Sequence, residues 1–542
     1  MDLHDIDRLE KIFPAEEDIP LADRLDPVHQ KEYLLDGKLV QWSGDRHQVF
    51  SPVCIQTAQG LVPKMIGSYP LCTGKEAWEA MMAAVKAYDN GRGEWPMMTV
   101  AERIDCVEKF VQEMNLQKDL VVKLLMWEIG KSHQDAVKEF DRTTEYIQAT
   151  MDALKQLDRR SSGFEQDQGI IAQIRRSPLG VVLCMGPFNY PLNETFTTLI
   201  PALIVGNTIL FKPPKHGTLL HYPLLDAFRK CFPPGVVNTV YGRGQAVIPE
   251  LMQSGHIDVL AMIGSSKVAN ELKKMHPRAN RLRAVLGLDA KNAAVITKNA
   301  DIALAVEESV LGSLSFNGQR CTAIKIIFVE RPIAEEFIAR FSDAVARLTI
   351  GMPWTKNVTL TPLPEPNKPA YLQDLIRDAT KHGAAICNIN GGQSAGSFVY
   401  PAVLYPVNSQ MRIYREEQFG PVIPVIAFDS LQEPMDYIHE SSYGQQISIF
   451  TNDSIELSGY IDQLMTQVSR ININSQCQRG PDILPFTGRK DSAEGTLSVT
   501  DALRAFSIRS VVAAKSNAHN KQILSRIVQE QQSSFLSTNY IF

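Results

Sequence analysis

Residues 179–275 alternate short apolar runs with longer amphipathic segments, and this alternation constrains the fold more than any other feature of the chain. The predicted strands are 179–185, 208–212 and 258–264, and the predicted helices are 195–205, 219–232, 245–255 and 265–275. Strands that alternate with helices indicate βαβ units and a parallel sheet. Because a similar alternation resumes near residue 292 and runs to about 470, we expect an α/β protein.

The segments outside this region are less regular. Residues 76–160 are mostly helical by their apolar spacing, and residues 502–516 combine a short helix with an edge strand. Residues 1–32 form an acidic lead without periodicity, and the tail from 516 onward is polar. We therefore expect the two ends to be extensions of the main fold, with the tail loosely held.

Composition limits the classes of partner. The chain has 542 residues with a net charge of −5, and 44% of its residues are hydrophobic. These values are ordinary for a globular protein and favour neither a nucleic-acid partner nor a membrane. The longest apolar run, 199–211, is interrupted by Gly206 and Asn207 and is too short to cross a bilayer.

The eight cysteines are scattered singly, with no CxxC pair and no Cys/His spacing typical of a zinc site. Unpaired thiols favour a reducing compartment, so we expect a cytoplasmic protein without a metal. The acidic N-terminus also has no apolar signal core.

One cysteine has neighbours that suit a nucleophile. Cys321 lies in SFNGQRCTAIK (315–325), where Arg320 can hold an anion and Gly318 permits a bend that brings backbone N–H groups close to the sulfur. A free cysteine is more often only a small buried apolar residue. The electropositive neighbours favour a reactive thiolate here.

Other polar residues follow predicted strands, and ligands of open parallel sheets bind outside the carboxyl ends of the strands. Asn189 could donate its side-chain amide to an oxyanion, although turn chemistry alone also explains an asparagine in that place. Lys212 and Lys215 form a compact basic turn, for which two solvated surface lysines are the alternative interpretation.

Two further segments carry weaker signals. Gly264 and Ser265 join a predicted strand to a predicted helix, and a helix N-terminus of this kind binds phosphate. In REEQFGPV (415–422), a carboxylate could hold ribose hydroxyls.

Motifs in the right order over nearly the whole chain resemble the aldehyde dehydrogenase superfamily. FNYP, FKPP, GQRCTA and RGPD..PF.G.KDS are most similar to its NADP-dependent non-phosphorylating glyceraldehyde-3-phosphate dehydrogenase branch. The resemblance implies an aldehyde dehydrogenase-like α/β fold with a Rossmann-type nucleotide-binding domain, a catalytic α/β domain and a small β arm for oligomerisation. The implied limits are 1–32 for an N-terminal extension, 33–160 and 179–288 for the nucleotide-binding domain, 289–492 for the catalytic domain, 161–178 and 493–515 for the arm, and 516–542 for a C-terminal extension.

The resemblance also implies a role for each matched residue. Cys321 matches the nucleophile that forms a thiohemiacetal and then a thioester, and Asn189 matches the oxyanion donor. The residues implied to bind NADP are Lys212, Lys215, Gly264, Ser265, Glu417 and Phe419. The residues implied to hold a substrate phosphate are Arg142, Tyr190, Arg320 and Arg479.

Two departures from the family pattern matter. Lys215 stands where NAD-preferring relatives carry a glutamate, which favours NADP through its 2′-phosphate. In AVLGLDAKN (284–292), Gly287 replaces the glutamate that activates the hydrolytic water, and Asp289 and Ala290 replace two glycines. Without that base, hydrolysis of the thioester is expected to limit turnover.

Three functions remain open at this point. The first is NADP-dependent oxidation of a phosphorylated aldehyde, such as glyceraldehyde 3-phosphate to 3-phosphoglycerate, with water as the final acceptor. The second passes the acyl group to another acceptor such as coenzyme A, and the third is a catalytically weakened member that binds nucleotide. The joint presence of Cys321, Asn189 and the arginines favours an enzyme, and the resemblance implies a homo-oligomer, either a dimer or a tetramer.

Overall fold

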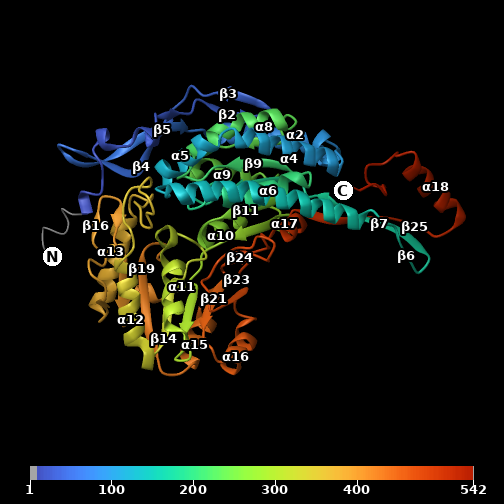
Figure 1. Ribbon diagram of the computed structural model, residues 1–542. Coiled ribbons are helices and arrows are strands. Elements are labelled where there is room, and N and C mark those ends of the chain that lie inside the picture. Colours follow the sequence, from blue (N-terminus) through green and yellow to red (C-terminus); the bar gives the residue numbers. More distant parts are fainter. Residues whose placement is uncertain (1–8, 541–542) are drawn as a thin grey trace.

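The computed structural model describes residues 9–540 of the protein. Two sheets form its two lobes, and a small third sheet projects away from them (Figure 1). The first lobe contains a six-stranded sheet in the order β10-β9-β8-β11-β12-β24. Its strands are β8 (Val181–Met185), β9 (Thr208–Lys212), β10 (Val237–Thr239), β11 (Val259–Ile263), β12 (Arg283–Gly287) and β24 (Ala493–Glu494). Every neighbouring pair is parallel except β12 with β24, which confirms the predicted parallel sheet.

Alternating side chains explain why helices cover both faces of this sheet. Val181 and Leu183 of β8 pack into one apolar cluster, whereas Val182 and Cys184 belong to the cluster on the other face. The helices of the first cluster are α2 (Gly74–Tyr88), α9 (Gly244–Gln253) and α10 (Ser266–Met275). Those of the second include α4 (Val100–Asn115), α5 (Lys118–Ile129), α6 (His133–Ser161), α7 (Asn193–Ile204) and α8 (Leu225–Cys231). A strand buried on both sides reads as a continuous apolar run, as predicted for 179–185.

The second lobe contains a seven-stranded sheet in the order β15-β18-β19-β14-β13-β21-β22. Its strands are β13 (Ala293–Ile296), β14 (Ile326–Glu330), β15 (Ala385–Ile386), β18 (Ala402–Tyr405), β19 (Val422–Phe428), β21 (Gln446–Phe450) and β22 (Arg470–Ile473). Its helices include α11 (Ile302–Leu314), α12 (Arg331–Ala346), α13 (Lys368–Lys381), α15 (Gln432–Glu440) and α16 (Ser454–Leu464). Only the short edge strand β15 is antiparallel to its neighbour, so the second predicted alternation is also confirmed.

The third sheet joins two segments that lie far apart in the sequence. It has the order β25-β7-β6, with β6 (Glu165–Asp167), β7 (Ile170–Pro178) and β25 (Ser507–Lys515). In the chain, β25 directly follows α17 (Val499–Ala505). Figure 1 shows this sheet extending from the body together with α18 (Ala518–Gln529). Its association with another subunit, like the domain limits given above, remains a prediction.

The chain ends contain more structure than the sequence patterns indicated. Leu9, Phe13, Ile19 and Leu25 are buried although their spacing follows no regular period. The segment before α2 adds β1 (Val28–His29), β2 (Glu32–Leu35), β3 (Lys38–Gln41), β4 (Arg46–Thr57) and β5 (Gly60–Pro70). At the other end, α18 was not predicted. Beyond it, the Ser537 carbonyl oxygen accepts hydrogen bonds from the side chains of Gln173 and Arg175, two residues of β7. Tertiary contacts therefore order both ends within the described residues.

One predicted helix is divided. The segment predicted at 219–232 begins as a 3₁₀ turn, η4 (Leu219–Leu224), and continues as α8. Pro223 lies in this turn and has no backbone N–H to donate, which disfavours an α-helical start.

Among residues 9–540, no helix is both long and apolar enough to cross a membrane.

Candidate active site

A cavity of about 1110 Å³ lies at the carboxyl ends of the strands in the first lobe. The last residues of four parallel strands line it, namely Met185, Lys212, Ile263 and Gly287. This is the edge at which open parallel sheets bind ligands. The second lobe closes the opposite wall with residues that follow α11 and β18. Every site residue singled out from the sequence lines this one cavity.

Cys321 is presented by a tight turn after α11. The turn η5 (Ser315–Gly318) contains Phe316 and Asn317 in the left-handed region and ends at Gly318, whose φ is 71°. A Cβ at Gly318 would lie 2.7 Å from the Ser313 carbonyl oxygen and 2.9 Å from that of Gly420. The glycine is therefore required by close backbone approach as well as by φ.

The surroundings of Cys321 set its protonation. Burial raises the pKa of the thiol, the charge of Glu194 raises that pKa further, and the Lys325 ammonium opposes both effects. Lys325 Nζ also donates to the Cys321 carbonyl oxygen at 2.9 Å, and Asn292 Nδ2 donates to the same oxygen at 2.8 Å. The backbone of Cys321 is thus held rigidly. Its thiol stays protonated to a higher pH than the thiol of an exposed cysteine would.

Asn189 lies in the loop between β8 and α7 and is almost fully buried. Its Nδ2 donates to the carbonyl oxygen of Gln319, two residues before Cys321, at 2.9 Å. The amide has a second N–H, which donates to no other group in the part of the chain that the structure describes. That remaining N–H is available to an oxygen bound beside Cys321.

A buried ion pair supports this loop and was missed by sequence reasoning. Lys131 and Glu139 are both fully buried and form a salt bridge. Lys131 Nζ also donates to the Asn189 carbonyl oxygen at 2.8 Å and lies 3.6 Å from the ring centroid of Tyr190. Glu139 Oε1 accepts from the backbone N–H groups of Leu192 and Asn193. No local pattern identifies two charges eight residues apart as a buried pair.

The outer end of the cavity is electropositive. Lys212 Nζ donates to the Pro213 carbonyl oxygen at 2.9 Å but forms no ion pair with a carboxylate among the described residues. Burial lowers the pKa of Lys212 to about 8. A partly buried ammonium without a counter-charge suits an anionic ligand, so this end fits the nucleotide that the sequence implied.

Three basic residues that the sequence reasoning missed lie near Lys215. The pKa of His216 is lowered to about 4, mainly by burial and further by the charges of Lys215 and His47. The pKa of His47 is also lowered, mainly by burial and further by the charges of Lys215 and Arg243. These mutual effects show that Lys215, His216, His47 and Arg243 are electrostatic neighbours, although they come from different segments.

The middle of the cavity has the residues predicted for the nicotinamide end. The Glu417 carboxylate lies 2.7 Å from Lys325 Nζ and accepts from the Ala290 N–H. Phe419 has a left-handed φ of 45°, and its ring centroid lies 5.8 Å from that of Phe188. The arrangement offers a carboxylate and an aromatic face side by side, which fits a ribose and a planar ring.

The start of α10 fits the predicted pyrophosphate less simply. Ser265 is the N-cap residue of α10, and its side chain accepts from the Val268 N–H. The Asp289 carboxylate accepts from Ser266 N at 2.7 Å and from Ser266 Oγ at 2.8 Å. A carboxylate therefore already uses part of the helix N-terminus that a phosphate would use.

The predicted arginine cluster is assembled but mostly paired. Arg142 forms a salt bridge of 2.8 Å with Asp482, and Arg479 forms one with Glu194. Arg320 forms no carboxylate pair within the described part of the chain, and its buried Nε has no hydrogen-bond partner there. Arg320 is therefore the arginine of the cluster best placed to bind an added anion.

The comparisons with known proteins agree with this geometry. The sequence matches the profile of the aldehyde dehydrogenase family over residues 54–512.
The chain belongs to the aldehyde dehydrogenase family.
The NADP-dependent glyceraldehyde-3-phosphate dehydrogenase of Streptococcus equinus is 32% identical over 445 residues, which cover 81% of this chain and 91% of that relative. The protein of the same name from Apium graveolens is 30% identical over 80% of this chain and 86% of its own length.

Solved structures of the family also match. The NADP-dependent glyceraldehyde-3-phosphate dehydrogenase from Bacillus halodurans C-125, complexed with NADP, superposes with a TM-score of 0.82 at 30% identity and covers 90% of this chain and 100% of its own. Lactaldehyde dehydrogenase from Escherichia coli has a TM-score of 0.82 at 26% identity, with coverage of 90% and 100%. The aldehyde dehydrogenase-like fold expected from the sequence motifs is thereby confirmed.

This member of the aldehyde dehydrogenase family has no carboxylate at Gly287, the last residue of β12. A Cβ at this position would lie 3.4 Å from Ile263 Cγ1 and 3.7 Å from Leu497 Cδ1, which is ordinary van der Waals contact. The wall of the cavity therefore has room for a Cβ at this position. No group of three or more His, Cys, Asp or Glu side chains within residues 9–540 is arranged to hold a metal ion.

Proposed function

We propose that this family member oxidises an aldehyde that carries an anionic group, with NADP as the hydride acceptor and Cys321 as the nucleophile. One observation carries the proposal: a single cavity joins the electropositive end at Lys212 to Cys321 and Asn189. A dinucleotide and a small aldehyde need such continuity because hydride passes directly between them. The names of the relatives lead us to propose glyceraldehyde 3-phosphate as the substrate and 3-phosphoglycerate as the product.

The residues divide the chemistry between them. Cys321 Sγ attacks the aldehyde carbon, and the free N–H of Asn189 stabilises the oxygen that becomes negative. NADP, when bound, accepts the hydride from that carbon and leaves the acyl group on Cys321 as a thioester. Because burial raises the pKa of Cys321, the attack should become faster as pH rises towards that pKa and the thiolate fraction grows.

Lys215→Glu should shift the cofactor preference from NADP towards NAD. Lys215 is exposed at the basic end of the cavity, where a 2′-phosphate would gain a charge-assisted hydrogen bond of about 1.5–3 kcal/mol. The affinity for NADPH should therefore fall roughly 10- to 100-fold, as measured by fluorescence titration, while that for NADH falls little. Lys521→Glu on α18 controls for the change of charge. Equal affinity of the unmodified protein for both cofactors would contradict the assignment.

Arg320→Met should weaken anionic aldehydes selectively. An anionic group would gain a charge-assisted hydrogen bond from the unpartnered Nε of Arg320, whereas an uncharged aldehyde would gain only a weaker bond. We expect kcat/KM for glyceraldehyde 3-phosphate to fall roughly 10- to 100-fold, the effect of one lost charge-assisted hydrogen bond. An uncharged aldehyde of similar size serves as the internal control. Equal losses for both aldehydes would mean that Arg320 supports the fold rather than the anion.

The proposed function as a whole is tested by steady-state NADPH formation with a panel of aldehydes and both cofactors. Dependence of turnover on added coenzyme A would favour acyl transfer over hydrolysis. Binding of NADPH without activity on any aldehyde would favour a nucleotide-binding role.

We also propose a homo-oligomer built through β7 and β25, whose exposed apolar side chains include Ile170, Ile508 and Val511. We further propose a cytoplasmic location, in keeping with eight free cysteines.

A further inference from the structure

The proposed reaction leaves a thioester, and its hydrolysis needs a proton acceptor beside the acyl carbon. The residue at the end of β12, Gly287, provides none. The cavity is lined by several carboxylates, namely Asp135, Glu139, Glu194, Asp289, Glu365 and Glu417. Their partners decide which of them is free to accept a proton from water.

Three of these carboxylates hold structural contacts within the fold. Glu139 pairs with Lys131 and accepts from two backbone N–H groups. Asp289 accepts from both the N–H and the hydroxyl of Ser266 at the start of α10. Glu417 pairs with Lys325 and accepts from the Ala290 N–H. Glu139 has both oxygens engaged, whereas Asp289 and Glu417 each use one oxygen to hold a neighbouring group in place.

Two others have local partners. Asp135, in the first turn of α6, accepts from the hydroxyl of the N-cap residue Ser132 at 2.8 Å. Glu365 pairs with Lys368, three residues along the chain, at 3.0 Å. Neither Asp135 nor Glu365 is among the groups whose charge acts most strongly on the pKa of the Cys321 thiol.

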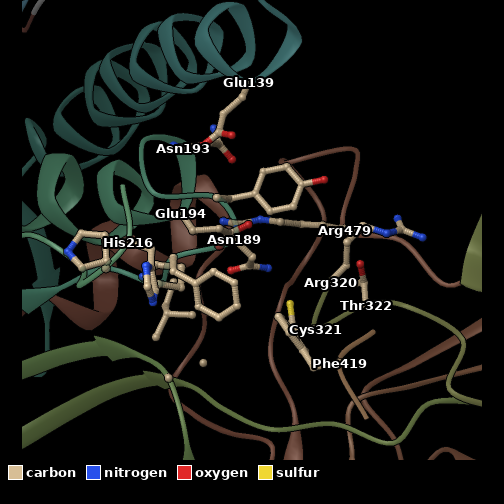
Figure 2. Close-up of a pocket in the computed structure, with 18 of the residues that line it drawn as sticks. Glu139, Asn189, Asn193, Glu194, His216, Arg320, Cys321, Thr322, Phe419 and Arg479 are labelled. Atoms are coloured by element: carbon tan, nitrogen blue, oxygen red, sulfur yellow. Dashed lines mark hydrogen bonds and ion pairs between the residues drawn. The ribbon is translucent and has the colours of Figure 1, made fainter. Parts of the chain in front are cut away.

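Glu194 is distinguished from the other five carboxylates by its position. It lies five residues after Asn189, in the first turn of α7, and is largely buried in the cavity wall. One carboxylate oxygen pairs with Arg479, and the other accepts no hydrogen bond from any residue between 9 and 540. Figure 2 shows Arg479 reaching across the cavity to Glu194, with Asn189 and Cys321 close below this pair in the view. The charge of Glu194 also acts on the Cys321 thiol.

We propose that Glu194 is the general base that activates water for hydrolysis of the Cys321 thioester, an inference that rests on the proposed function. The free carboxylate oxygen takes a proton from water as the water oxygen bonds to the acyl carbon. The carbon–sulfur bond then breaks, the electron pair returns to Sγ, and the proton passes from Glu194 to solvent. Thioester and water become a carboxylic acid, a thiolate at Cys321 and one proton released to solvent, with no further reactant.

The ion pair with Arg479 occupies one oxygen of the Glu194 carboxylate. Arg479 also lies within 3.4 Å of Asp482, so the arginine is shared between two carboxylates. An anionic group on the substrate would compete for Arg479 and release Glu194 to act on water.

Glu194→Gln tests the proposal in stopped-flow experiments with excess aldehyde and NADP. The rapid formation of one equivalent of NADPH should be preserved, because acylation does not use Glu194. The slow phase that follows should fall by about 10²–10⁴-fold, the usual contribution of a positioned general base. Asp289→Asn is the comparison for the rival carboxylate and should lower the slow phase much less.

Hydroxylamine separates a base from a merely structural role, because it attacks a thioester without needing proton removal by the protein. Hydroxamate formation from the acylated Glu194→Gln variant should match that of the unmodified protein, while hydrolysis by water stays slow. An intact burst with an unchanged slow phase in Glu194→Gln would overturn the inference. So would equal loss of the hydroxylamine and water reactions. Absence of any burst in the unmodified protein would instead refute the proposed function on which the inference rests.

Discussion

Replacing Cys321 with alanine is expected to lower aldehyde oxidation by on the order of 10⁶-fold, the effect of removing the nucleophile from a covalent catalyst. No other thiol can take its place, because among residues 9–540 no second cysteine lines the cavity. The measurement is NADPH formation under single-turnover conditions, with NADPH titration to verify that the variant still binds the cofactor.

Cys387→Ala is the matched control, since Cys387 is also a free, half-buried cysteine but does not line the cavity. It should retain the activity of the unmodified protein. Residual oxidation in Cys321→Ala at more than about one hundredth of the original rate would show that hydride loss does not need a covalent intermediate, and the role of Cys321 would have to be abandoned.

The second large effect is expected from Gly287→Glu. The unmodified protein should form NADPH in a burst of at most one equivalent per Cys321, followed by slow turnover, because no carboxylate stands at the end of β12. A glutamate at 287 adds a carboxylate at the end of β12, where a Cβ meets only ordinary van der Waals contacts. We expect the slow phase to accelerate by about 10²-fold, at the lower end of the range for a positioned base, while the burst rate stays nearly constant.

Gly287→Gln provides the control, because it adds a side chain of the same size without a base. It should leave the slow phase unchanged or slower. A linear trace from the unmodified protein, without a burst and at an ordinary turnover rate, would show that hydrolysis is not limiting. If both variants accelerated the slow phase equally, packing rather than proton transfer would be the cause.

The sequence by itself predicted the α/β architecture and most of the central elements. The strand at 179–185 was recognisable because residues buried on both faces of a parallel sheet leave a continuous apolar run, and it appears as β8 (Val181–Met185). The burial of Phe13 and the helix α18 (Ala518–Gln529) were not recognisable. In those segments order depends on contacts with distant parts of the chain rather than on local periodicity.

The sequence also determined which residues meet in the cavity. Motifs that follow successive parallel strands, such as Asn189 and Lys212, are brought to one edge of a sheet by the strand direction alone, and the cavity lies at that edge. Their positions along the chain were therefore sufficient to predict that they lie together.

Only the tertiary structure decided how these residues are partnered. The sequence offered Arg142, Arg320 and Arg479 as equivalent cations, yet two of them are neutralised by carboxylates from distant segments, which leaves Arg320 unpaired among the described residues. Glu194 became a candidate base for a similar reason, because the fold places it near Cys321 and Asn189 with one oxygen unpartnered among the described residues. Ion pairs form between side chains that the fold brings within a few ångströms, and residues 194 and 479 acquire that proximity only when the two lobes pack together.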